Sequence, residues 1–170
     1  SLQVSNLSEA AADEIGANPL ISKVGALYHD IGKMKKPEYY IENQHSSYNP
    51  HDEQPPLKSA EIIIDHVFHG IELGKKYKIP EMIIDFIRTH HGTSRVEYFL
   101  HKYKSQNPDD EIDESLFAYP GPVPFSKETA ILMLADSVEA SSRSLKDPTN
   151  KNIEELVDKI FKQKVESDQL

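Results

Sequence analysis

Apolar residues recur at every third or fourth position through most of this chain, and this helical periodicity constrains the fold more than any other feature. The first run begins with Leu2 and Val4 and stops near Gly16, a residue type that often ends helices. Asn18 is then a candidate helix cap, with Pro19 at the first helical position. No segment strongly predicts a strand. We therefore predict an all-α helical bundle, with helices over residues 2–16, 19–32, 57–78, 80–91, 93–105 and 126–145 and a last one around 153–161.

Two long segments between these helices lack the periodicity. Pro37 to Pro56 is polar, aromatic and interrupted by prolines, and Asn107 to Pro124 contains four prolines. Long irregular segments inside a compact domain are often functional. We therefore expect ordered loops here rather than linkers.

Composition sets limits on the class of protein. The 170 residues are 38% hydrophobic, which fits one core and a single domain over residues 1–170. The absence of Cys excludes thiolate metal sites, so any metal must be held by imidazole and carboxylate. A net charge of -9 argues against binding duplex nucleic acid, although a small anion can bind where metal ions supply positive charge. No stretch approaches the roughly 20 apolar residues that span a bilayer, and the start is amphipathic rather than a signal peptide.

Residue types that bind metals are set into the apolar segments. The pair His29-Asp30 falls in the last turn of the second predicted helix. His66 shares a helical face with apolar residues and should point inward, although periodicity does not separate it from His69. Asp136 lies in an apolar run, where a buried carboxylate is costly without a cation. A single histidine of this kind is more often structural, but the set indicates a metal site.

His90 and His91 are a special case because they are adjacent. Neighbouring residues on a helix point about 100° apart, so one ring would face inward and the other outward. Gly92 follows directly, and we expect the helix to end there and to let both rings face the same site.

Six motifs give the chain a resemblance to a known family. They are His29-Asp30-Ile31-Gly32-Lys33, Ile41-Glu42-Asn43-Gln44, Asn49-Pro50-His51, His90-His91-Gly92-Thr93-Ser94, Tyr119-Pro120-Gly121-Pro122 and Ala135-Asp136-Ser137-Val138-Glu139-Ala140. Together with His66 they resemble the HD superfamily of metal-dependent phosphohydrolases and, within it, the cytoplasmic HD domain of seven-transmembrane HD proteins. The likeness covers essentially the whole chain. It implies a cytoplasmic domain of an integral membrane protein, whose membrane region lies outside this chain.

Characterised members of that family hydrolyse cyclic di-AMP to linear pApA at a dinuclear iron or manganese centre. The resemblance implies the same activity here, with a metal-bridging hydroxide as the nucleophile. Nickel, cobalt or zinc would fit the same ligands. Two alternatives stay open: an HD phosphohydrolase of another nucleotide or cyclic dinucleotide, and a catalytically silent module that senses a nucleotide. A silent module predicts a broken ligand set, whereas every ligand within the range of this chain is present.

The resemblance also implies roles for single residues. Asp30 would bridge two metals and act in catalysis. The other ligands fall into one site completed by His29 and Asp136 and a second completed by His66, His90 and His91.

Three more residues are candidates for contacts with substrate. Lys33 is placed to meet a phosphate oxygen and is the second candidate catalytic residue; the alternative is a solvated lysine at a helix end. Arg143 is a weaker phosphate candidate of the same kind. Tyr119 is a candidate base-stacking wall, although rigidity of its proline-rich loop is the favoured role.

In the family an additional His precedes the segment that matches Ser1, and this chain starts just after that position. We expect the loss of one imidazole to weaken one metal site by about tenfold or more. The metal at Asp30, His66, His90 and His91 should therefore be held firmly, and the other loosely.

The remaining sequence adds less. The histidines expected not to bind metal are His45, His51, His69 and His101. The acidic end, Val165 to Leu170, is expected to be frayed surface helix. The oligomeric state is left open.

Overall fold

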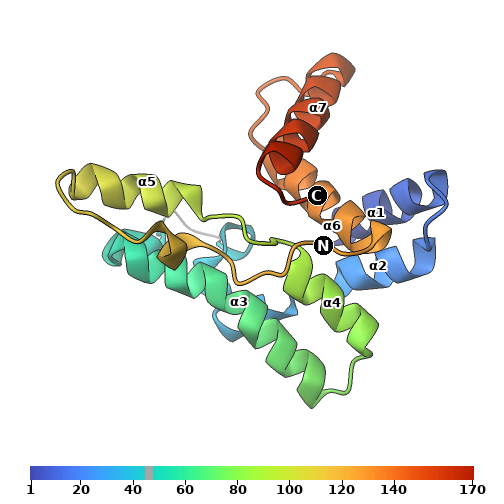
Figure 1. Cartoon of the computed structure of the whole chain (residues 1–170), viewed down its shortest axis with the longest axis horizontal. Coiled ribbons are helices and arrows are strands. Elements are labelled where there is room, and N and C mark those ends of the chain that lie inside the picture. The colour runs from blue at the N-terminus through green and yellow to red at the C-terminus, as the bar shows by residue number, and fades with distance from the viewer. Residues whose placement is uncertain (45–47) are drawn as a thin grey trace.

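A computed structural model of the chain describes residues 1–44 and 48–170, and its regular elements are helices (Figure 1). The described residues form no strand, and Arg95 and Ala118 form an isolated antiparallel bridge. The prediction of an all-α bundle with two long irregular loops is confirmed. The helices are α1 (Leu2–Glu14), α2 (Pro19–Tyr28), α3 (Pro56–Lys76), α4 (Glu81–Thr89), α5 (Glu97–Gln106), α6 (Lys127–Ser142) and α7 (Asn150–Glu166).

Local signals set most of the helix ends. The Asn18 side chain accepts a hydrogen bond from the Ile21 N–H at 3.1 Å, so it caps α2 as predicted. Ser126 and Thr129 form a reciprocal capping box at the start of α6. Gly16 follows α1 with φ +65, the left-handed conformation that ends many helices.

Two helices are shorter in the structure than predicted, because residues at one end of each make tertiary contacts instead of continuing the helix. α2 ends at Tyr28 rather than near Gly32, and the chain tightens into the 3₁₀ helix η1 (Ile31–Lys35), whose Gly32 lies against the backbone of α3. α5 begins at Glu97 rather than Thr93. Thr93 lies in a turn, and the residues after it pair with the second loop: Arg95 forms the bridge with Ala118, and the Val96 N–H donates to the Phe117 carbonyl at 2.8 Å.

Clusters of buried side chains hold the helices together, and two of them join three or more segments. The first joins α1, α2, α4 and α6 through Val4, Ala26, Phe86, Leu132 and Ala135. The second joins α3, α5 and the second loop through Ala60, Phe99, Leu100 and Phe117. Helices α2, α4 and α6 pack on one another, and α3 packs on α4 and on η1.

Both irregular segments are ordered where the structure describes them. The first contains the 3₁₀ helices η2 (Pro37–Tyr39), η3 (Ile41–Asn43) and η4 (Pro50–Glu53), and His45 lies outside the described residues. Tyr40 is buried, and its hydroxyl donates to the Ile62 carbonyl on α3 at 3.3 Å. The second segment contains η5 (Glu114–Phe117) and is anchored by the buried Phe117. The expectation of ordered loops rather than linkers is confirmed outside residues 45–47.

The C-terminal segment differs from the expectation of a frayed surface helix. Helix α7 continues to Glu166, and Gln169 beyond it is only 4% exposed. Its side chain bonds to Thr93, 76 residues earlier in the chain. A contact at that separation leaves no trace in local periodicity.

None of the helices in the described part of the chain combines the length and the apolar character needed to cross a membrane.

Candidate metal centre

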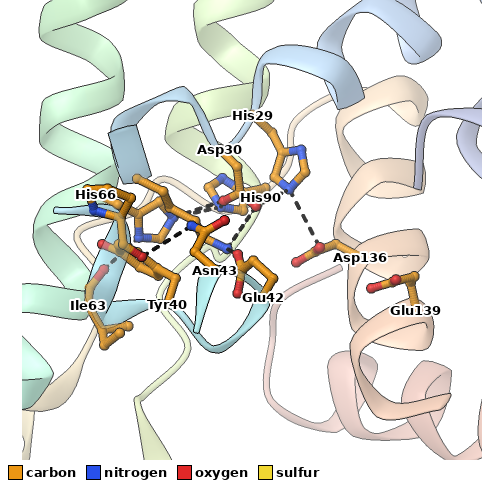
Figure 2. Close-up of polar contacts among 12 residues, drawn as sticks. His29, Asp30, Tyr40, Glu42, Asn43, Ile63, His66, His90, Asp136 and Glu139 are labelled. Carbon is orange, nitrogen blue, oxygen red and sulfur yellow. Dashed lines mark hydrogen bonds and ion pairs between the residues drawn. The ribbon is translucent and has the colours of Figure 1, made fainter. Parts of the chain in front are cut away.

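The pair His29-Asp30 lies at the junction of α2 and η1, where its carboxylate faces imidazoles from the ends of α2 and α4 and from the middle of α3 (Figure 2). The Oδ2 atom of Asp30 lies 3.1 Å from His29 Nε2. Its Oδ1 atom lies 3.5 Å from His66 Nε2 and 3.8 Å from His90 Nε2. The two oxygens of one carboxylate thus face two different sets of nitrogen ligands, as a carboxylate that joins two cations must.

Three of the histidine rings are oriented by the same kind of hydrogen bond to a backbone carbonyl. The Nδ1 atoms of His29, His66 and His90 lie 2.6, 2.5 and 2.8 Å from the carbonyl oxygens of the residues three positions earlier. A carbonyl only accepts, so each Nδ1 carries the hydrogen and each Nε2 turns toward Asp30. A hydrogen bond from the second ring nitrogen to a carbonyl is the usual way that proteins orient a metal-binding histidine.

The contact between His66 and His90 fits a site that binds a cation. Their Nε2 atoms lie 3.1 Å apart, and both rings are buried to 1% exposure. Because both hydrogens sit on Nδ1, two lone pairs face each other across this distance when the rings are neutral. A cation between them turns that repulsion into two bonds. Among the described residues, buried Asp30 Oδ1 and His29 Nε2 also have no hydrogen-bond partner.

His91 joins the same group from the end of α4. Because α4 ends at Thr89 and Gly92 takes φ +55, the rings of His90 and His91 lie side by side, with centroids 4.0 Å apart. Both adjacent histidines therefore face the centre, as the helix-ending glycine predicted. Within the described residues, two groups of three bring their ligand atoms within 4.8 Å of one another: His66, His90 and His91, and His29, Asp30 and His90.

Asp136 lies on α6, across the centre from α3. Its Oδ1 atom is 3.5 Å from His29 Nε2, and its side chain is 23% exposed. Its carboxylate is therefore partly open to solvent and lines one side of the centre, rather than being fully buried. The structure brings all six predicted ligands together, and their assignment to individual ions stays a proposal.

Burial and charge separate the histidines into two kinds. Burial lowers the pKa values of His66 and His91, and it lowers that of His90 to about 3. These rings are neutral at pH 7 and ready to bind a metal. Burial also opposes the charged form of His29, but the carboxylates of Asp30 and Asp136 outweigh it and raise the pKa of His29 to about 10. In the metal-free centre a proton therefore occupies His29.

This difference predicts how metal binding depends on pH. An ion bound by His29 must displace its proton, so its apparent affinity should rise about tenfold per pH unit from pH 7 towards pH 10. An ion bound by His66, His90 and His91 displaces none, so its affinity should be nearly constant above pH 7. Calorimetric titration with Mn²⁺ in buffers of different ionisation enthalpy measures the protons released. We expect about one proton for the first kind of ion and about none for the second. Proton release from neither ion would contradict the assignment.

The centre forms the floor of a cleft of about 650 Å³. Four carboxylates line it (Asp30, Glu42, Asp136 and Glu139), against three positively charged side chains (Lys33, Arg143 and the protonated His29). The cleft is thus acidic without added cations, and an anionic substrate would be repelled from it. This volume lies within the range of small-molecule sites.

The candidate substrate residues all line this cleft. Lys33 is not a solvated lysine: its ammonium lies 2.8 Å from Asp30 Oδ2 and 2.7 Å from Glu42 Oε1. Arg143 is more exposed and is held by Glu139 through contacts of 2.7 and 2.9 Å. The ring of Tyr119 stacks on His91, with centroids 4.1 Å apart and an angle of 20°, so one of its faces is already covered.

Sequence reasoning missed the partners of these residues. Glu42 and Glu139 lie within two of the family motifs, but the sequence predicts no role for either. Glu139 follows Asp136 by one helical turn, a spacing that could have placed it on the same face. Nothing local connects Glu42 to Lys33. Tyr40 was also missed; its ring lies 5.1 Å from the Lys33 ammonium.

The histidines expected not to bind metal take no part in either ligand group where they are described. His51 is buried in the first loop, with Nε2 3.0 Å from the Tyr39 carbonyl. His69 is partly exposed one turn beyond His66, and His101 lies 3.8 Å from Glu97 on α5. The burial of His66 and the partial exposure of His69 favour His66 as the ligand, which stays a prediction.

Comparison with known proteins gives relatives over the whole chain. It is 47% identical over 169 residues, 99% of its length, to the cyclic-di-AMP phosphodiesterase PgpH of Bacillus subtilis (strain 168), of which it covers 24%. It is also 47% identical over 162 residues, 95% of its length, to the protein of that name from Listeria monocytogenes serotype 1/2a (strain 10403S), of which it covers 22%. The chain thus spans about a quarter of the length of these curated relatives.

The chain is also similar to a solved structure of one such relative and matches the model of a protein family. The crystal structure of the L. monocytogenes phosphodiesterase PgpH HD domain in complex with cyclic-di-AMP has a TM-score of 0.94 and 45% identity, covering 99% of this chain and 78% of that one. The model of the HD domain matches residues 1–141, which contain all six predicted ligands. The chain therefore belongs to the HD domain family.

Proposed function

We propose that this domain is a metal-dependent phosphodiesterase that hydrolyses cyclic di-AMP to linear pApA. The observation that carries the proposal is the convergence of imidazole Nε2 atoms on both oxygens of Asp30 at the floor of an open cleft. The similarity to a domain solved with cyclic-di-AMP supports the choice of substrate. We further propose that the parent protein is an integral membrane protein with this domain in the cytoplasm.

The ligand set fits two divalent transition metals, and we propose iron or manganese. Asp30 would bridge them, with His29 and Asp136 on one side and His66, His90 and His91 on the other. When bound, the metals would lower the pKa of an attacking water and neutralise charge on the phosphodiester oxygens. The lining of the cleft contains an excess of carboxylates, so substrate binding should depend on the metals as well.

The protein's own residues position the substrate beside the metals. Burial opposes the charge on Lys33, but Asp30 and Glu42 raise its pKa above the ordinary value, so its ammonium is permanent. A permanent cation can hold a phosphate oxygen but is a poor proton donor for a leaving group. We therefore assign Lys33 to electrostatic stabilisation of the phosphoryl group. The exposed Arg143 guanidinium at the rim can contact the second phosphate.

This assignment predicts that Lys33→Met slows hydrolysis by about 100-fold. Both metals should stay bound, because the variant removes a positive charge next to Asp30. Turnover of cyclic di-AMP and metal content per chain test these two statements together. Lys35→Met is the matched control, since Lys35 is half exposed and lies 3.2 Å from Glu72, outside the cleft. Equal activities of the two variants would refute the role of Lys33.

The family resemblance places a further His upstream of Ser1, and Ser1 lines the cleft. We propose that this His completes the site of His29 and Asp136. A chain extended upstream should then hold two ions tightly, whereas residues 1–170 should hold one firmly and one loosely. Two firmly held ions in residues 1–170 would refute this proposal.

The test of the proposed function is hydrolysis by the extended chain loaded with Mn²⁺ or Fe²⁺. Cyclic di-AMP, cyclic di-GMP and a panel of mononucleotides are compared, with Asp30→Ala as the negative control. Metal-dependent release of pApA that the control lacks would establish enzyme and substrate. Turnover of another nucleotide would move the proposal to that substrate. Binding of cyclic di-AMP without turnover would favour a sensor module.

A further inference from the structure

Gln169 makes an unusual contact for a residue near the end of a chain. Its side-chain Oε1 accepts a hydrogen bond from the Thr93 N–H at 2.8 Å. Its Nε2 donates to Thr93 Oγ1 and to the Ser167 carbonyl, both at 2.9 Å. Both ends of a buried amide are therefore satisfied, and removing it would leave a partly buried backbone N–H without a partner.

The backbone before Gln169 forms a tight turn that directs its side chain towards Thr93. The N–H of Asp168 donates to the Val165 carbonyl at 3.1 Å, and that of Gln169 donates to the Lys164 carbonyl at 2.9 Å. Asp168 takes φ +54. This pattern is the Schellman ending of a helix, and it turns the chain sharply at the end of α7.

The residue that Gln169 bonds lies in the segment that presents two candidate metal ligands. Thr93 comes two residues after His91, and the Ser94 hydroxyl donates to the His91 carbonyl at 2.6 Å. Gly92 lies between them; a Cβ there would collide with the Gln169 amide and come within 2.9 Å of Met133 Cε. The amide therefore packs directly on the turn that brings both histidine rings to His66.

Helix α7 has few other anchors. Within Asn150–Glu166, all of which the structure describes, Ile160 alone is buried. The helix packs on α6 and extends away from the other helices, with its C-terminal end returning towards the centre of the molecule (Figure 1). The contact of Gln169 with Thr93 thus joins this sparsely packed helix to the turn that follows His90 and His91.

We propose that Gln169 is a positioning residue for the metal centre: it fixes the turn from His90 to Thr93 and couples the seating of α7 to metal affinity at His66, His90 and His91. The inference rests on the metal centre of the proposed function. It assigns no contact between Gln169 and metal or substrate.

The test compares Gln169→Met, which keeps the length of the side chain and removes its hydrogen bonds, with Gln163→Met at an exposed position of α7. Two readouts are measured: amide hydrogen exchange at Thr93 in the metal-free protein, and titration with Co²⁺ followed by its visible spectrum. Gln169→Met should speed exchange at Thr93 and weaken Co²⁺ binding at His66, His90 and His91 by about fivefold. Affinity at His29 and Asp136, and both readouts in Gln163→Met, should not change.

Faster exchange at Thr93 with unchanged Co²⁺ affinity and spectrum would overturn the proposal, as would unchanged exchange. If Gln169→Met does not fold, Thr93→Val and Thr93→Ser probe the same contact from the other side. The Ser variant should then retain the Co²⁺ affinity that the Val variant loses, and equal affinities would overturn the proposal. Failure of the wild-type protein to bind Co²⁺ would overturn the metal centre itself, which distinguishes the two failures.

Discussion

In the chain extended upstream of Ser1, the variant Asp30→Asn is expected to hydrolyse cyclic di-AMP on the order of 10³-fold more slowly than the wild type and to lose tight binding of both metals. The reason is the position of its two oxygens. Oδ2 faces His29 at 3.1 Å, and Oδ1 faces His66 at 3.5 Å. An amide has the same size but no charge, and its nitrogen cannot bind a cation. One substitution therefore weakens both sites.

Metal content and turnover measured on the same folded sample test this prediction. Asp65→Asn is the matched control, because Asp65 precedes His66 on α3 but is not among the residues that line the cleft. The control should retain both metals and full activity. Two bound metals in Asp30→Asn, or activity within tenfold of wild type, would show that Asp30 does not join the two sites.

Gly32→Ala is expected to destabilise the domain by at least about 3 kcal/mol, although Gly32 does not have a positive φ. A Cβ at this position would overlap the backbone carbonyl of His66 and lie 2.5 Å from the backbone nitrogen of Gly70. Backbone atoms of a central helix cannot move aside as a flexible side chain can. η1 and α3 would have to separate, which would also draw His66 away from Asp30.

Thermal unfolding of the metal-free protein measures this effect, and a fall in Tm of roughly 10 °C is expected for a domain of this size. Gly16→Ala provides the contrast. A Cβ there meets nothing within 4 Å, so only the cost of φ +65 remains, about 1 kcal/mol. Similar losses of stability in the two variants would contradict the close approach at Gly32.

Much of the candidate centre was predictable because the relevant signals are local. The pair His29-Asp30 follows an apolar helix, and Gly92 directly follows His90 and His91, so the type and approximate place of these ligands can be read within a few residues. The helical periodicity predicted that the His66 side chain points inward, but it did not exclude His69 as the ligand. The resemblance to the HD family supplied what local signals lack, namely that segments far apart in the sequence meet at one centre.

The sequence by itself determined the all-α class, the cap at Asn18, the two loops and the ligand types, because each depends on neighbours within about one helical turn. Only the tertiary structure decided that α5 starts at Glu97, that Lys33 lies between Asp30 and Glu42, and that Gln169 holds Thr93. These features join residues through packing across the bundle. The sequence alone is compatible with many contacts between distant residues, and the packing of the folded chain selects one set of them.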